Sequence, residues 1–172
     1  IHVGLDEVFL IGEDSCPLCN RKDKGELFSH AVNMLYNHCV KKKGLKMYMW
    51  GDRLIDGEDV ASGYESEYES SYNGTYKAID LIPKDIVICD WHYDRLKIYG
   101  SIPYFLNKGF SVLPVSFNDV KATKALIDYS LLYGENRNML GHMYTAWDNF
   151  TNKKLSKHKA MIKTIEKLKN RR

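Results

Sequence analysis

Residues 86–115 read IVICDWHYDRLKIYGSIPYFLNKGFSVLPV and contain two apolar runs, 86–91 and 110–115, with a helix-length segment at about 95–107 between them. Both runs are rich in β-branched residues, as strands usually are. Strands that are apolar throughout are typical of a parallel sheet that is buried on both faces. The stretch therefore predicts a strand–helix–strand unit and an α/β fold.

The same alternation continues on both sides of this unit. Further apolar runs are found at 1–5, 45–50 and 139–144, and further helix-length segments at 23–43, 119–133 and 155–170. The sequence therefore predicts about five βα units in a single domain that spans residues 1–172.

Several helix ends carry signals of their own. The segment 119–133 has Asn118 or Asp119 as its N-cap and Gly134 as its stop, and Gly44 is a plausible stop for 23–43. The last helix is expected to turn five apolar residues inward, namely Leu155, Met161, Ile162, Ile165 and Leu168.

Composition excludes some classes of function. The formal net charge is only +3, and the lysines of the tail 153–172 fit the outer face of a helix, so no nucleic-acid partner is expected. No apolar run approaches the roughly 20 residues that a membrane span requires. Because the chain starts inside a predicted strand, the lack of a signal peptide leaves a periplasmic, secreted or cytoplasmic location open.

Polar and aromatic side chains follow every predicted strand. In parallel βα architectures the carboxyl ends of the strands meet on one rim, where catalytic groups collect. The groups are Asp6 and Glu7; Trp50, Asp52 and Arg53; Asp90, Trp91, His92 and Tyr93; Ser116, Asn118 and Asp119; and Thr145, Trp147 and Asp148. The sequence therefore predicts an aromatic, acidic pocket on this rim.

The residues HVGLDEV at 2–8 resemble the His-x-Gly-x-Asp-Glu signature of glycoside hydrolase family 20, the β-N-acetylhexosaminidases. Trp50, Trp91 and Trp147 match, in order and approximate spacing, the tryptophans that line the sugar pocket of that family. The resemblance implies a TIM (β/α)8-type barrel, of which this chain would supply the C-terminal half, strands four to eight.

The resemblance also implies a function: removal of terminal N-acetylhexosamine residues from glycans by a retaining, substrate-assisted mechanism without a cofactor. Family 20 is an exception to the rule of two carboxylates with one nucleophile, because the sugar's own acetamido carbonyl attacks the anomeric carbon. Glu7 would be the general acid and then the base, and Asp6 would orient the acetamido group. The residues expected to bind substrate are His2, Trp50, Asp52, Trp91, Tyr93 and Trp147.

Two departures from the family pattern leave the preference between GlcNAc and GalNAc open. Phe117 stands where the family has a tyrosine on strand seven, and Tyr93 is a candidate to replace that hydrogen-bond donor. Asp148 directly follows Trp147, whereas many members carry a carboxylate slightly further on.

Three further readings remain open. A half barrel leaves sheet edges that a missing N-terminal half or a second copy must cover, so the fragment alone could be inactive. The chain could be a glycan-binding barrel domain without turnover. It could also be a metal-dependent TIM-barrel enzyme with Asp6, Glu7, Asp52 and His92 as ligands.

Four cysteines are too few for a disulfide scaffold in a chain of 172 residues. The motif CPLC has a geometry that presents the thiolates of Cys16 and Cys19 to one metal ion, and it is a candidate for structural zinc, with further ligands from Asp14, His30 or Cys39. Reduced thiols or a local disulfide are the alternatives.

Residues 52–84 interrupt the rhythm of strands and helices. They are rich in Ser, Gly, Tyr and acidic residues, and they are expected to form a surface loop or a lid over the substrate cleft. They include the sequon Asn73-Gly-Thr75, and a second sequon begins at Asn149.

Overall fold

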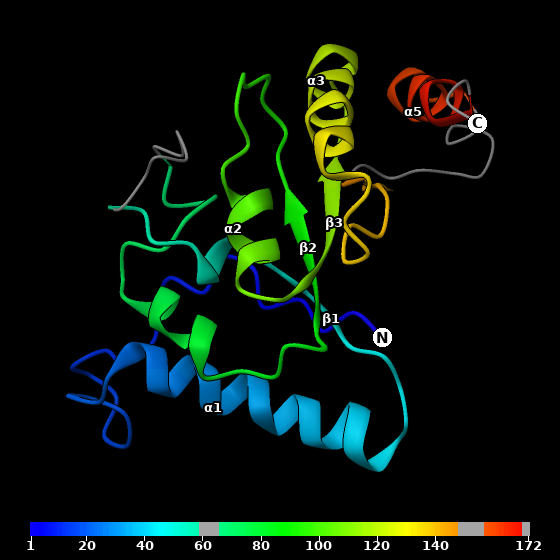
Figure 1. Cartoon of the computed structure of the whole chain (residues 1–172). Helices are drawn as coiled ribbons and strands as arrows, with labels where there is room; N and C mark the ends of the chain where they lie inside the picture. Colours follow the sequence, from blue (N-terminus) through cyan, green and yellow to red (C-terminus); the bar gives the residue numbers. More distant parts are fainter. Residues whose placement is uncertain (59–65, 148–156, 170–172) are drawn as a thin grey trace.

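The computed structural model of the protein describes residues 1–58, 66–147 and 157–169 (Figure 1). Within these residues a four-stranded parallel sheet runs in the order β1-β2-β3-β4. Its strands are β1 (Tyr48–Trp50), β2 (Val87–Trp91), β3 (Ser111–Ser116) and β4 (Met143–Tyr144). The predicted α/β fold with a parallel sheet is therefore confirmed, and each strand pairs with the next one in the chain.

The predicted strand at 1–5 forms only in part. His2 makes a single parallel bridge to Tyr48, and the backbone N–H of Val3 donates to the Tyr48 carbonyl at 2.9 Å. Beyond that point the backbone leaves the extended conformation, because Gly4, Leu5 and Glu7 all have positive φ angles. The segment therefore lies beside β1 and then turns, instead of continuing as a strand.

Helix α1 (Lys24–Tyr36) begins where the sequence predicts. Its N-cap Asp23 accepts a hydrogen bond from the Glu26 N–H at 3.0 Å, and Phe28, Val32 and Tyr36 form its buried face. The helical segment continues as the π-helix η1 (Asn37–Lys42) and ends before Gly44, whose φ is 66°.

Helix α2 (Ser101–Asn107) is shorter than the predicted segment 95–107. The buried Tyr99 explains the difference, because its hydroxyl donates to the Asp94 carbonyl at 3.1 Å and accepts from the Leu96 N–H at 3.2 Å. These bonds hold residues 94–99 as a loop. Pro103 is tolerated because it lies in the first turn, where backbone N–H groups have no helical partner.

Helix α3 (Val120–Ser130) has the predicted N-cap, since Asp119 accepts from the Ala122 N–H at 2.6 Å, and the short helix η4 (Leu131–Tyr133) extends it to Gly134. Helix α5 (Lys159–Lys169) lies beside α3 (Figure 1). Its predicted inward face is correct only in part, because Met161 and Ile162 are half-buried whereas Ile165 and Leu168 are exposed. The fully buried residues of α5 are Ala160 and Thr164. Leu155 and Asp148 lie outside the described residues.

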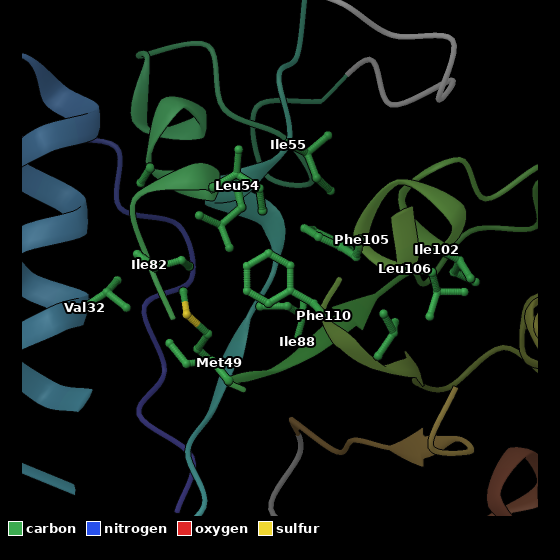
Figure 2. Packing of buried hydrophobic residues seen from close by; sticks show 14 of the residues in the cluster. Val32, Met49, Leu54, Ile55, Ile82, Ile88, Ile102, Phe105, Leu106 and Phe110 are labelled. Carbon is green, nitrogen blue, oxygen red and sulfur yellow. The ribbon is translucent and has the colours of Figure 1, made fainter. Parts of the chain in front are cut away.

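The two faces of the sheet are packed differently. Met49 and Ile88 point into the main core, which Val32, Phe105 and Phe110 complete from the surrounding elements (Figure 2). Val112 of β3 belongs to the same core. The other face carries a smaller cluster around Trp50, Cys89 and Val115, with half-buried Tyr48, Trp91, Leu113 and Met143 at its margin. The alternation of side chains along each strand separates these two sets.

Candidate active site

The acidic pair lies on a strained turn next to the end of β1. Leu5 has φ 72° and Glu7 has φ 51°, a left-handed conformation that is uncommon for residues with a Cβ and unusual for a bulky one. Such a backbone persists only where surrounding contacts impose it, and it is more frequent at functional sites. Asp6 is half-buried and Glu7 is exposed, so both carboxylates are placed where a ligand can reach them.

Asp52, at the start of the short helix η2 (Asp52–Leu54), holds this turn through a hydrogen bond to its backbone. Its Oδ2 accepts from the Glu7 N–H at 2.8 Å and from the Arg53 Nε–H at 2.8 Å, and its Oδ1 accepts from the Trp91 indole N–H at 3.4 Å. Burial raises the pKa of Asp52 to about 6, against the opposing effects of these donors.

A cavity of about 260 Å³ opens directly beside the turn. Its lining consists of Asp6, Glu7, Trp50, Trp91, Tyr93 and Trp147. The ring centroids of Trp50 and Trp147 are 6.1 Å apart, and those of Trp91 and Tyr93 are 4.9 Å apart. The structure thus brings both predicted catalytic residues and four of the six predicted substrate-binding residues into one cavity.

Tyr93 is placed as a hydrogen-bonding group in this cavity. Its hydroxyl oxygen accepts from the Trp147 indole N–H at 2.8 Å, and its ring packs against Phe117 with the centroids 5.5 Å apart. Burial raises the pKa of Tyr93 to about 12, so the phenol keeps its proton at neutral pH and can donate it. Tyr93 and Phe117 are therefore neighbours. The prediction that Tyr93 replaces a tyrosine donor at position 117 requires this proximity.

The other two predicted substrate-binding residues, His2 and Asp52, do not line the cavity. Asp52 is only 3% exposed. The His2 ring packs on Trp50 with the centroids 4.5 Å apart, and its Nδ1 accepts from the Gly4 N–H at 3.1 Å. Partial burial lowers the pKa of His2 although Asp6 opposes the change, so the imidazole is neutral and supports the turn.

His92 lies in a separate buried cluster rather than with the acidic pair. Its Nδ1 is 3.2 Å from a Glu69 oxygen, and its Nε2 is 3.2 Å from Asp90 and 2.9 Å from the Ser101 hydroxyl. No group of three or more His, Cys, Asp or Glu side chains within residues 1–58, 66–147 and 157–169 is arranged to hold a metal ion. The four ligands of the metal-enzyme reading therefore do not converge.

The contacts Ser101–His92–Glu69 resemble a catalytic triad, but the protonation state of His92 does not fit one. Although burial lowers the pKa of His92, Asp90 and Glu69 outweigh burial and raise it to about 9, so the ring is an imidazolium and cannot accept the serine proton. The Ser101 hydroxyl donates instead to Asp90 at 2.7 Å. This cluster is a buried ion network that ties Glu69 to the end of β2.

Two residues of the site were not predicted from the sequence. Arg53 is 1% exposed, and its Nη2 donates to the carbonyl oxygens of Glu67, Tyr68 and Ser70. The side-chain amide of Asn73 donates to the carbonyls of Val8 and Phe9 at 3.0 and 2.9 Å. Sequence patterns offered only the sequon for Asn73 and a position after β1 for Arg53, and neither signal indicates these long-range contacts.

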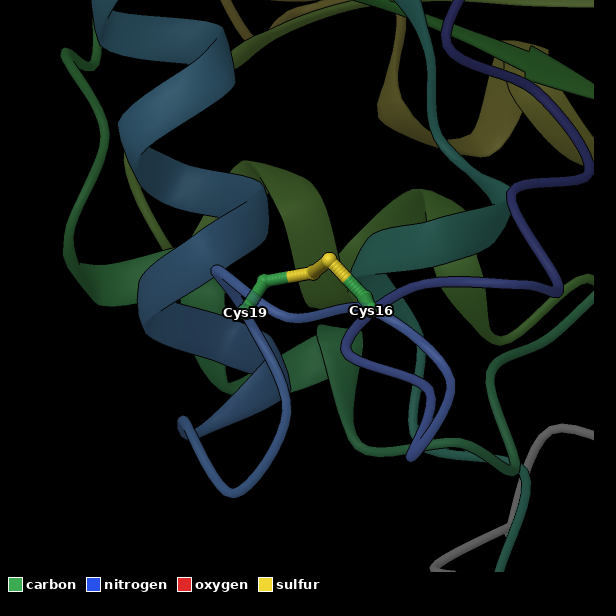
Figure 3. Close-up of a disulfide and its surroundings, with 2 residues drawn as sticks. All are labelled: Cys16 and Cys19. Atoms are coloured by element: carbon green, nitrogen blue, oxygen red, sulfur yellow. A yellow bond between two sulfur atoms is a disulfide. The ribbon is translucent and has the colours of Figure 1, made fainter.

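The motif CPLC is a disulfide between Cys16 and Cys19, located beside the start of α1 (Figure 3). Bonded sulfur atoms cannot serve as zinc thiolates, so the structure has the third of the three alternatives. Cys39 and Cys89 are both buried and free.

A larger cavity of about 690 Å³ lies away from the acidic pair, between α2 and the short helix η3 (Thr75–Asp80). Its charged side chains are engaged with other groups: Lys108 pairs with Asp80 at 2.6 Å, and Lys77 pairs with Asp23 at 3.3 Å. Tyr76 and Tyr104 also line it. Ser101 lines it as well, and its hydroxyl donates to Asp90 in the buried ion network.

Comparisons with known proteins do not assign the chain to a family. No protein-family model and no curated protein matches its sequence. Among the described residues, no helix has the length and apolar character needed to cross a membrane. The resemblance to family 20 therefore rests on the motif at 2–8 and on the residues around the cavity.

Proposed function

We propose that the protein is a glycoside hydrolase that removes terminal N-acetylhexosamine residues with the acetamido group of the substrate as nucleophile. The observation that carries the proposal is the 260 Å³ cavity in which Asp6 and Glu7 face three tryptophans and Tyr93. Its size lies below the roughly 300–1,000 Å³ of pockets for drug-sized ligands, as suits a single sugar ring. Aromatic faces pack against the apolar faces of a sugar, and two adjacent carboxylates serve two adjacent atoms.

The proposed roles follow from the positions of the side chains. Glu7, exposed at the cavity, protonates the leaving oxygen and then activates water. Asp6 accepts the acetamido N–H and stabilises the positive charge that develops on the cyclised intermediate. Tyr93, which keeps its proton, donates to the acetamido oxygen and favours the conformation in which that oxygen attacks the anomeric carbon.

We further propose that the chain supplies the second half of a TIM-type barrel. The strands lie in the sheet in the same order as in the chain, β1-β2-β3-β4, and every pair of adjacent strands is parallel. Doubly wound sheets reverse their strand order at a switch point, whereas a barrel does not. The site also lies where the strands end at their carboxyl side, since Trp50 and Trp91 are the last residues of β1 and β2.

The test is the dependence of Glu7→Gln on the leaving group, measured on the protein with its complete barrel. We expect a loss of about 10²–10⁴-fold in kcat/KM with an unactivated N-acetylglucosaminide, because removal of a general acid costs this much. An activated aryl glycoside should lose much less. Glu13→Gln is the control, because that carboxylate lies outside the cavity lining and pairs with Lys24 at the start of α1, so its loss should change neither rate.

Two outcomes would reject the proposal. Hydrolysis of plain glucosides as fast as of N-acetylglucosaminides, with no inhibition by a thiazoline analogue of the cyclised intermediate, would show that the sugar does not supply the nucleophile. Binding of N-acetylhexosamine without turnover, unaffected by Glu7→Gln, would identify a glycan-binding domain instead.

A further inference from the structure

We propose that Asp52 is a positioning residue for the acid: it fixes the backbone of Glu7 and the indole of Trp91 relative to each other and does not contact the sugar. The inference rests on the proposed function of Glu7 and extends it to a residue outside the cavity. It also replaces the substrate contact that the sequence suggested for Asp52.

Both oxygens of the Asp52 carboxylate accept hydrogen bonds from protein donors. One oxygen receives the Glu7 N–H and the Arg53 Nε–H, both at 2.8 Å, and the other receives the Trp91 indole N–H at 3.4 Å. The side chain is 1% exposed, which leaves no approach for a sugar hydroxyl. Asp52 therefore acts only through the two residues that do line the cavity.

Arg53 makes this carboxylate rigid. Its guanidinium is buried, bonds to Asp52 and donates to three carbonyl oxygens of the segment 66–71, while its own carbonyl accepts from the Thr75 hydroxyl at 2.9 Å. Arginine is suited to such a site because its planar fork of donors holds several acceptors in fixed directions. The buried pair thus connects the insertion after β1 to the acidic turn.

The turn needs such support. The left-handed backbone of Glu7 is disfavoured by itself, and the bond from its N–H to Asp52 is a specific contact that holds it. Without that bond the peptide can relax toward ordinary φ values, and the Glu7 carboxyl then moves away from the leaving oxygen. A displacement of about 1 Å in a catalytic group can cost about 10²-fold in rate.

The kinetic test compares Asp52→Asn with Asp80→Asn, an exposed aspartate on η3 that pairs with Lys108. We expect Asp52→Asn to lower kcat about 10–100-fold on an unactivated glycoside and far less on an activated aryl glycoside, with little change in KM. Asp80→Asn should leave both substrates unchanged. If Asp52 had a purely structural role, Asp52→Asn would lower the rates on both substrates by the same factor, because it would reduce only the amount of folded enzyme.

A double variant separates positioning from substrate binding. In Glu7→Ala the acid is absent, so adding Asp52→Asn should cause little further loss on the unactivated glycoside. Multiplied losses, or an equal rise in KM for both substrates, would overturn the inference and restore a sugar contact. If Glu7→Ala alone kept full activity, the proposed function itself would be rejected. That result differs from the one that rejects the role of Asp52, in which the losses of the two single variants multiply in the double variant.

A measurement on the unaltered protein covers the case in which Asp52→Asn does not fold. We expect the Glu7 amide and the Trp91 indole N–H resonances to titrate together with one midpoint, because both donate to the same carboxylate. The Trp147 indole, which donates to Tyr93, should not follow. The charged groups around this site are Arg53, Asp6 and Glu7, and the neutral Tyr93 also lies beside them. Independent midpoints for the two donors would contradict the shared contact.

Discussion

Single residues of the acidic turn depart most clearly from what the sequence predicts. The motif at 2–8 indicated the pair Asp6–Glu7, because motif and spacing are local properties of the chain. The left-handed conformations of Leu5 and Glu7 were not predictable, because each of them conflicts with the local preference of a residue that has a Cβ. Contacts with Asp52 and Asn73, far away in the sequence, impose them.

Asp52 should leave a signature in the pH dependence of stability. Burial raises the folded pKa of Asp52 to about 6, above the ordinary value of 3.8, so between these pH values the native state binds a proton that the unfolded chain has released. Linkage then requires the free energy of unfolding to fall as pH rises from about 4 to about 6, by up to about 3 kcal/mol from this group.

The measurement is urea unfolding of the wild type and of Asp52→Asn at several pH values. The difference between the two proteins should change in favour of the variant between pH 4 and pH 6 and then stay constant. A difference that does not change across this range would show that burial does not shift the titration of Asp52. Asp80→Asn serves again as the control.

At the scale of elements, those with local signals were predicted well. Helix α3 has its N-cap Asp119 where the sequence indicates it, and the helical segment, continued by η4, stops at the predicted Gly134. Helix α2 was predicted too long, because the hydroxyl of Tyr99 holds residues 94–99 as a loop. The inward face of α5 was predicted only in part, because α5 fully buries the small residues Ala160 and Thr164 and leaves Ile165 and Leu168 exposed.

The insertion after β1 should contribute to stability through Asn73. Its amide donates to the Val8 and Phe9 carbonyls, and its oxygen accepts from the Thr75 N–H and from the Ser71 and Thr75 hydroxyls. Asn73→Ala leaves these partners unpaired and should cost about 1–3 kcal/mol in urea unfolding.

Asn33→Ala is the matched control for this prediction. Asn33 makes one exposed hydrogen bond, to the Leu81 carbonyl at 3.1 Å, and its removal should cost less than about 1 kcal/mol. Equal losses in the two variants would mean that the contacts of Asn73 with the acidic turn are not formed in solution.

On the scale of the whole molecule, the two faces of the sheet predict different behaviour in solution. The helices cover the face of Met49, Ile88 and Val112, whereas Tyr48, Leu113 and Met143 on the opposite face are only half-buried. Under the half-barrel proposal, further strands would complete the burial of this face. The alternation of strands and helices predicted the sheet, but sequence periodicity does not indicate whether a sheet closes.

The 172-residue chain alone should therefore bind an environment-sensitive apolar dye, and the protein with its complete barrel should not. Leu113→Gln should reduce the dye signal more than Leu132→Gln does, although Leu132 is 74% exposed, because Leu132 is not part of this apolar cluster. A complete barrel that binds as much dye as the chain alone would contradict the proposal that this face becomes the barrel interior.

The strand order also determines when the site can form as the chain is synthesised. As β2, β3 and β4 leave the ribosome, each finds its pairing partner already synthesised, so the sheet can grow by addition at one edge. The acidic turn behaves in the opposite way. It lies among the first residues of this chain, yet the groups that shape it follow more than forty residues later: Asp52 is 45 positions after Glu7, and Asn73 is 65 positions after Val8. The two carboxylates proposed as catalytic are therefore synthesised before the residues that fix their geometry, and they acquire that geometry only when Asp52 and Asn73 have emerged and packed against the turn.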